Sequence, residues 1–192
     1  MKKTILISLV IALAFLFSCK YKNATVTDSD TAQSNNKNNL VNKPLKKFNW
    51  EYSEDINQMT SKKDFFAKTY STNLLNFQPP YDGSQNAMLF LRYKGVENDV
   101  TLSIEKGQFY VYGGSLEDGN SGTIKIRFDD GKAKEYEYST PSDGGTDMIF
   151  IHPAKAIINK MKKSKIMFIQ VSFYNEGSQI LNFNVDSLKW DH

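Results

Sequence analysis

The chain has 192 residues, of which 40% are hydrophobic, with 24 basic residues, 21 acidic residues and one cysteine. A single cysteine excludes an intramolecular disulfide. The net charge is only +3 and falls to +1 if the first 18 residues are removed with their two lysines. The clustered positive charge of a nucleic-acid-binding protein is therefore not indicated.

Residues 1–18 have the layout of a signal peptide, with two lysines before an apolar run from Ile5 to Phe17. At ~1.5 Å per residue the run spans about 20 Å, less than the ~30 Å core of a bilayer, so a permanent transmembrane helix is not expected. The sequence "LFSC", which ends at Cys19, resembles the bacterial lipobox. This resemblance implies that Cys19 carries palmitate and other acyl chains in the cell envelope, with the outer membrane as the expected site. A secretory signal that is cut elsewhere near Cys19 is the alternative.

Residues 19–46 are predicted to be the lipid-anchored cysteine and a disordered tether. The stretch is rich in Asn, Ser, Thr, Asp and Lys and has few large apolar side chains. Such a composition cannot bury enough surface to offset the entropy of ordering the chain. As a flexible coil the tether reaches roughly 30 Å, enough to hold a domain clear of the lipid headgroups.

Residues 47–192 have the size of one domain and the pattern of an antiparallel β-protein. Turn signals such as "PPYDG", "DDGK" and "PSDGG" recur about every ten residues, and the runs between them alternate or are rich in β-branched and aromatic residues. This spacing predicts a mainly β fold, an antiparallel β-sandwich or a barrel-like sheet. The expected strands are 87–94, 99–105, 108–113, 122–128, 134–139, 147–151, 165–174 and 179–185.

One short amphipathic helix is predicted after Pro153 and is expected to pack on the sheet. Its apolar residues have helical spacing, and lysines gather at its C-terminal end. These lysines could touch anionic lipid or a partner, or they could form a solvated face that compensates the helix dipole. The apolar residues are Ala154, Ile157, Ile158 and Met161, and the lysines are Lys160, Lys162, Lys163 and Lys165.

Arg92 and Arg127 are the only arginines in the chain, and both fall within apolar strands. Residue parity places Arg127 on the polar face of its strand, and the turn that follows contains Asp129 and Asp130. The planar guanidinium pairs with carboxylates and stacks on aromatic rings in ways that lysine cannot. Two interpretations stay open: fixed internal pairs with carboxylates on adjacent strands or loops, or a grip on an anionic ligand.

The series "LFLRYKGVENDVTLSIEKGQF", "GTIKIRFDDGK" and "LNFNVDSLKW" resembles a family of small exported bacterial β-domains. That family includes the VasI-type accessory proteins of type VI secretion and related uncharacterised lipoproteins. The family pattern falls here on Trp50, Asp55, Met59, Leu89–Arg92, Arg127–Gly131 and Phe183–Leu188. The resemblance implies a structural role for both arginines and no catalytic activity.

Catalytic and metal-binding motifs are not found in the sequence. His152 precedes Pro153 at a helix start and His192 ends the chain, so a capping role and a frayed end are expected. There is no HExxH, C-x-x-C or EF-hand pattern, so no metal site and no cofactor are expected. Weak Ca²⁺ binding by converging acidic loops, or a carboxylate pair for glycoside hydrolysis, is the alternative. The acidic loop residues are Asp118, Asp129, Asp130, Asp143 and Asp147.

Aromatic residues in the strands could form either the core or an exposed row that stacks on sugars or anchors a protein. They are Tyr110, Tyr112, Tyr136, Tyr138, Phe173, Tyr174 and Trp190.

The sequence as a whole favours a lipid-anchored envelope protein whose non-catalytic β-sandwich binds a protein partner, in the manner of a secretion accessory. One alternative is a carbohydrate-binding module or weak hydrolase of the cell surface. The other is a periplasmic immunity or inhibitor protein.

Overall fold

The computed structural model describes residues 49–81, 83–110 and 121–192. The expected signal peptide at 1–18, the tether at 19–46 and Cys19 all lie outside these residues. The described part is mainly β, with a large antiparallel sheet, one short helix and no closed barrel, which confirms the predicted fold class and is consistent with a β-sandwich.

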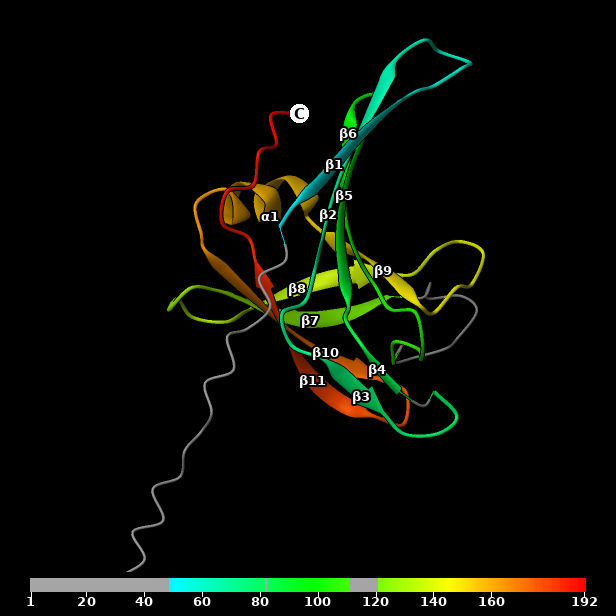
Figure 1. Ribbon diagram of the computed structural model, residues 1–192, viewed down its shortest axis with the longest axis vertical. Coiled ribbons are helices and arrows are strands. Elements are labelled where there is room, and N and C mark those ends of the chain that lie inside the picture. The colour runs from blue at the N-terminus through cyan, green and yellow to red at the C-terminus, as the bar shows by residue number, and fades with distance from the viewer. Residues whose placement is uncertain (1–48, 82, 111–120) are drawn as a thin grey trace, which may run out of the picture. The chain divides into compact units, whose positions relative to one another are not determined.

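Nine strands form one antiparallel sheet in the order β1-β2-β5-β6-β9-β8-β7-β10-β11 (Figure 1). They are β1 (Glu51–Ile56), β2 (Lys63–Tyr70), β5 (Met88–Lys94), β6 (Glu97–Ser103), β7 (Ser121–Phe128), β8 (Lys134–Ser139), β9 (Met148–His152), β10 (Ile166–Phe173) and β11 (Gly177–Asn184). A separate two-stranded ribbon consists of β3 (Leu75–Phe77) and β4 (Gly83–Gln85).

The nine-stranded sheet turns back on itself at the short strand β9. This strand has only three paired positions with β6 and three with β8, so it joins two halves that cross in Figure 1. The segment after β2 then reaches the other end of the sheet, where Ser71 forms an isolated bridge with Phe183 of β11. The backbone N–H of Thr72 also donates to the carbonyl of Asn182 at 2.7 Å. Strands distant in sheet order therefore meet around one shared core.

The core is a single cluster built from the inward residues of both halves of the sheet and from the helix. Alternation decides which side chains enter it, since neighbouring residues of a strand point to opposite faces. In β10, for example, Met167, Ile169, Val171 and Phe173 are buried.

Helix α1 (Ala154–Met161) packs against β6 with an apolar stripe of three buried residues, Ile157, Ile158 and Met161. Pro153 stands at its N-cap position. The predicted helix and its apolar face are therefore confirmed. No helix among the described residues is long and apolar enough to cross a membrane.

Strands β1 to β4 are all absent from the runs that predict β5 to β11. All six residues of β1 are exposed, so the strand has no alternation between apolar and polar positions. It is held by pairing with β2, from Glu51 opposite Lys68 to Ile56 opposite Lys63, and by the Tyr52 hydroxyl, which accepts the backbone N–H of Lys189 at 2.9 Å. Pairing across a sheet edge is a tertiary property that a hydrophobic pattern cannot predict.

Candidate functional site

A groove runs over the outer face of β7, β10 and β11, the face that points away from the core. It consists of two hollows of about 370 and 240 Å³ that share Phe168 and Asn182. We call it the Phe168 groove. The first hollow is lined by Thr72, Lys165, Ile166, Phe168, Asn182, Phe183, Asn184 and Asp186, and the second by Lys125, Arg127, Ala133, Phe168, Gln170, Ile180 and Asn182.

The register of the three strands places these side chains in rows across the sheet. Arg127 of β7 stands opposite Phe168 of β10, and Phe168 stands opposite Asn182 of β11. Successive side chains of a strand point to opposite faces of the sheet, so alternate residues of these strands point away from the core and towards the groove. Two aliphatic side chains are exposed on this face, Ile166 by 43% and Ile180 by 55%. The outer face of β7, β10 and β11 therefore exposes aliphatic side chains that a solvated sheet surface does not require.

Arg127 lies over the ring of Phe168 and lines the groove. Its guanidinium carbon is 3.9 Å from the centre of the Phe168 ring, and its Nη1 donates a hydrogen bond to the carbonyl oxygen of Asp129 at 2.6 Å. Among the described residues it forms no ion pair with a carboxylate. Aromatic stacking and one backbone acceptor hold this guanidinium in place.

Asp129, the nearest carboxylate in sequence, is engaged elsewhere. Its Oδ1 accepts the backbone N–H groups of Lys165 and Ile166, both at 2.9 Å. These two hydrogen bonds favour the ionised carboxylate and hold the pKa of Asp129 below its ordinary value of 3.8. Asp129 therefore ties the turn after β7 to the start of β10, while Asp130 is exposed in the same turn.

Arg92 differs from Arg127, because it has a carboxylate partner. On β5 its Nε and Nη2 both contact the Oδ2 of Asp99, each at 2.7 Å, and Asp99 stands directly opposite it on β6. The pair is half-exposed on the outer face of the sheet. This is the cross-strand pair that the structural interpretation of the arginines expects.

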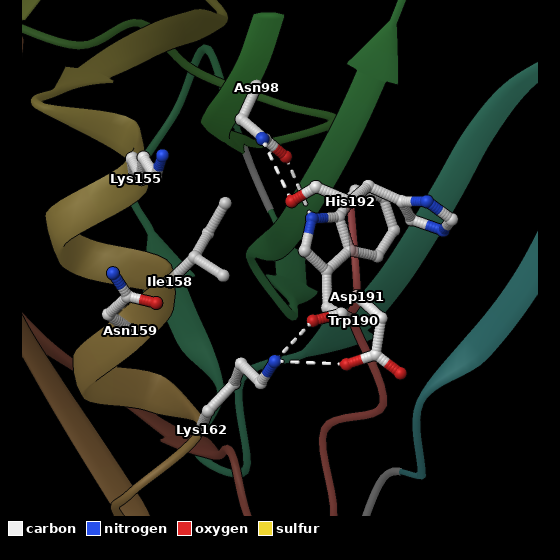
Figure 2. Close-up of a pocket in the computed structure, with 8 residues that line it drawn as sticks. All are labelled: Asn98, Lys155, Ile158, Asn159, Lys162, Trp190, Asp191 and His192. Carbon is white, nitrogen blue, oxygen red and sulfur yellow. Dashed lines mark hydrogen bonds and ion pairs between the residues drawn. The ribbon is translucent and has the colours of Figure 1, made fainter.

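A second cavity, of about 240 Å³, lies between α1 and the chain segment at Trp190–His192 (Figure 2). Figure 2 shows the Lys162 side chain reaching from the end of α1 to this segment, where its Nζ donates to the carbonyl of Trp190 at 2.6 Å and to Oδ1 of Asp191 at 3.0 Å. The Trp190 indole N–H donates to Oδ1 of Asn98 at 2.8 Å. These polar groups fasten the segment to the helix and to β6, which indicates a structural role for this cavity.

His192 is packed, so its expected frayed position is wrong. Its ring stacks on Phe65 at a centroid distance of 3.9 Å and lies 5.4 Å from the ring of Tyr93. Its carbonyl oxygen also accepts a hydrogen bond from Asn98 at 3.3 Å. Only the folded sheet brings these aromatic side chains beneath it.

His152 does not cap the helix, so its expected capping role is also wrong. It is the last residue of β9, and its Nε2 is 2.9 Å from the Oγ of Ser139 on β8. Glu137 stands opposite His152 in the register, but among the described residues no carboxylate forms an ion pair with this histidine. The Ser139–His152 contact thus joins two strands on an exposed face.

The acidic loop residues form no cluster of metal ligands in the part of the chain that the structure describes. There, no group of three or more His, Cys, Asp or Glu side chains could hold a metal ion. Asp129 binds backbone N–H groups as described above, and the Oδ1 of Asp143 accepts the N–H of Gly145 at 3.0 Å. Asp118 lies outside the described residues.

Most of the aromatic candidates belong to the core. Two tyrosines remain exposed, Tyr110 by 44% and Tyr174 by 47%, and backbone pairing of their segments brings both to the end of β10. Tyr112 lies outside the described residues. The buried aromatic candidates are Tyr136, Tyr138, Phe173 and Trp190.

Comparisons of this chain with protein-family models, with curated proteins and with solved structures find no match. The resemblance to the VasI-type proteins therefore stays a prediction, and functional inference depends on the site itself.

Proposed function

We propose that this chain is a lipid-anchored protein of the bacterial envelope whose non-catalytic β-domain binds a protein partner through the Phe168 groove. The observation that carries the proposal is the exposure of Ile166 and Ile180 beside Phe168 on a concave strand face. The lipid anchor is inferred from the lipobox-like sequence at Cys19. A secretion accessory role fits the resemblance to the VasI-type proteins.

The composition of the groove supports protein binding. Protein interfaces combine apolar centres that exclude water with a polar rim, and arginine and aromatic residues are enriched in them. Ile166, Phe168 and Ile180 supply the apolar centre, and Arg127 and Lys125 supply a polar edge. A partner that covered the two isoleucines would gain the free energy of removing them from water.

Carbohydrate binding is the second candidate, and the exposed Tyr110 and Tyr174 are the observation in its favour. The groove itself suits sugars less well. Sugar rings stack on bare aromatic faces, whereas one face of Phe168 is covered by the Arg127 guanidinium at 3.9 Å. If this chain binds glycans, the binding should therefore depend on Tyr174 and not on Ile180.

The test is a crosslinking pull-down from native envelopes with the full chain and two matched variants. Ile166→Ser combined with Ile180→Ser removes the exposed aliphatic surface of the groove without opening the core. Val96→Ser is the control, because Val96 is 80% exposed at the turn between β5 and β6 and lines neither hollow. We expect wild type and Val96→Ser to retain a saturable protein partner. The double variant should bind this partner about tenfold or more weakly.

The result decides between the two candidates. Equal capture by the double variant and wild type would contradict a role for the groove. Retention of envelope glycan alone, lost on Tyr174→Ala, would favour the carbohydrate-binding module. An immunity or inhibitor role would be indicated if the captured protein were a toxin whose activity falls on binding.

A further inference from the structure

We infer that the partner segment that fills the Phe168 groove is an extended acidic peptide with an apolar anchor residue. The inference rests on the proposed function and adds the chemistry of the partner. Three cationic side chains line the groove, Lys125, Arg127 and Lys165, against one lining carboxylate, Asp186, while Glu135 of β8 stands opposite Lys125. The mature chain is almost neutral, so this excess of positive charge is local.

Arg127 is the main cation of the Phe168 groove. In the described part of the chain its guanidinium has one hydrogen-bond acceptor, the carbonyl of Asp129, although it carries five N–H donors. The Asp129 carboxylate does not pair with it among the described residues, and its Oδ1 accepts the backbone N–H groups of Lys165 and Ile166 instead. Arg92, by contrast, is paired with Asp99. Of the two arginines, only Arg127 presents a fixed cation beside a groove.

The spacing of the cations fits an extended peptide. Lys125 and Arg127 are alternate residues of β7 and so project from the same face about 6.6 Å apart. An extended peptide lying along the strand repeats its own side chains at this interval, so two carboxylates at positions i and i+2 would meet the two cations. The next position on that face, i+4, would pass Phe168, which stands opposite Arg127, and would reach Ile166.

Carboxylates are the anions that this arrangement fits best. The guanidinium over the Phe168 ring presents its in-plane N–H groups as a planar fork, which matches the two oxygens of a carboxylate. The isoleucines on either side require an apolar group on the same ligand. A peptide supplies both groups at a fixed repeat, whereas the headgroups of a lipid surface have no such repeat.

The test uses defined peptides and the full chain in phosphatidylcholine nanodiscs. The probe is a fluorescein-labelled peptide with the central sequence Glu-Thr-Glu-Thr-Leu, compared with versions that carry Gln or Lys in place of both Glu residues. Fluorescence anisotropy measures binding. We expect the acidic peptide to bind about tenfold or more tightly than the Gln peptide, as charge-assisted hydrogen bonds predict, and the Lys peptide to bind weakest.

Matched variants locate the effect. Arg127→Gln and, separately, the exposed Lys125→Gln should each reduce the preference for the acidic peptide. Lys94→Gln should not, because Lys94 lies at the end of β5 and lines neither hollow. Thermal unfolding of each variant checks that the fold is kept. Rising salt concentration should weaken binding of the acidic peptide most.

Several outcomes would overturn the inference. They are equal binding of the three peptides, no binding of the acidic peptide, no effect of either groove variant, or competition by phosphatidylglycerol vesicles that depends on Arg127. None of these would by itself remove the proposed function. The proposed function falls instead if the Ile166 and Ile180 double variant captures its envelope partner as well as wild type does.

Discussion

Arg92 and Arg127 occupy equivalent positions in the pattern of their strands, yet they have different partners. Both face outward from apolar strands, so residue parity cannot distinguish them. Arg92 has Asp99 across one ladder and Phe66 across the other, whereas Arg127 has Phe168 and no carboxylate paired opposite it. The cross-strand neighbour thus determines whether the guanidinium forms an ion pair or stacks on a ring. One arginine fits the structural interpretation, and the other lies at the candidate site.

Asp129→Asn tests the role of the carboxylate that joins the turn to β10. Its pKa is held below 3.8 in the folded protein, so its charge stabilises the fold fully above that pH, and the contribution is lost as the pH falls towards the folded pKa. We expect a lower urea midpoint for the variant at pH 7 and a difference from wild type that closes below pH 3.8. Asparagine accepts the positive φ of +46° at this position, so backbone strain is not introduced.

Asp130→Asn is the matched control for this experiment. Asp130 is exposed in the same turn. We expect its variant to follow wild type at both pH values. A difference between Asp129→Asn and wild type that stayed constant with pH would show that geometry, and not charge, carries the effect.

At the scale of elements, the hydrophobic pattern of the sequence predicts the helix and the strands that bury one face. Strands β5 and β7 to β11 alternate and α1 has a stripe of three buried residues, so each has a periodic signal, whereas β6 buries three consecutive residues. The exposed strand β1 has none. The run at 108–113 is described only to residue 110, where Phe109 forms a single bridge with Phe173. Element prediction therefore works where large apolar residues are buried on one side, and fails at the exposed edge strand β1 and at β2, whose buried positions are Asp64, Ala67 and Thr69.

Ile157→Ala tests the packing of α1 on the sheet. Ile157 is fully buried on the helix face that meets β6, so the truncation leaves a cavity and should lower the free energy of unfolding by about 2–5 kcal/mol. Lys155→Ala on the exposed side of α1 should change it by no more than about 0.5 kcal/mol. Urea denaturation measures both values. Equal effects of the two substitutions would contradict the packing of α1 described above.

At the scale of the whole molecule, the Phe168 groove depends on chain segments that are distant in sequence. Lys125 and Arg127 come from β7, Phe168 from β10 and Ile180 from β11. The nearby bridge between Ser71 and Phe183 adds the segment after β2. Each residue is an unremarkable outward strand position when considered alone. The groove exists because strand order places these positions in neighbouring rows.

Cys19→Ala tests the anchor that the amino-terminal sequence predicts. Several acyl chains hold a protein stably on a membrane, whereas loss of the lipidated cysteine removes them all. We expect wild type to be found in the membrane fraction and in the detergent phase. Cys19→Ala should move to the soluble fraction. Ser34→Ala, in the same amino-terminal segment, should behave as wild type. Mass spectrometry of the mature amino terminus would contradict the anchor if it found Cys19 without acyl chains.

The sequence by itself determined the fold class, most of the strands and the helix, because one-sided burial imposes a period on the residues. It also singled out Cys19 and the two arginines as residues to explain. Only the tertiary structure decided that Arg92 pairs with Asp99, that Arg127 stacks on Phe168 and that an apolar groove opens beside it. These features depend on which strands become neighbours and in what register. Local periodicity carries no information about either, since both arise from long-range pairing.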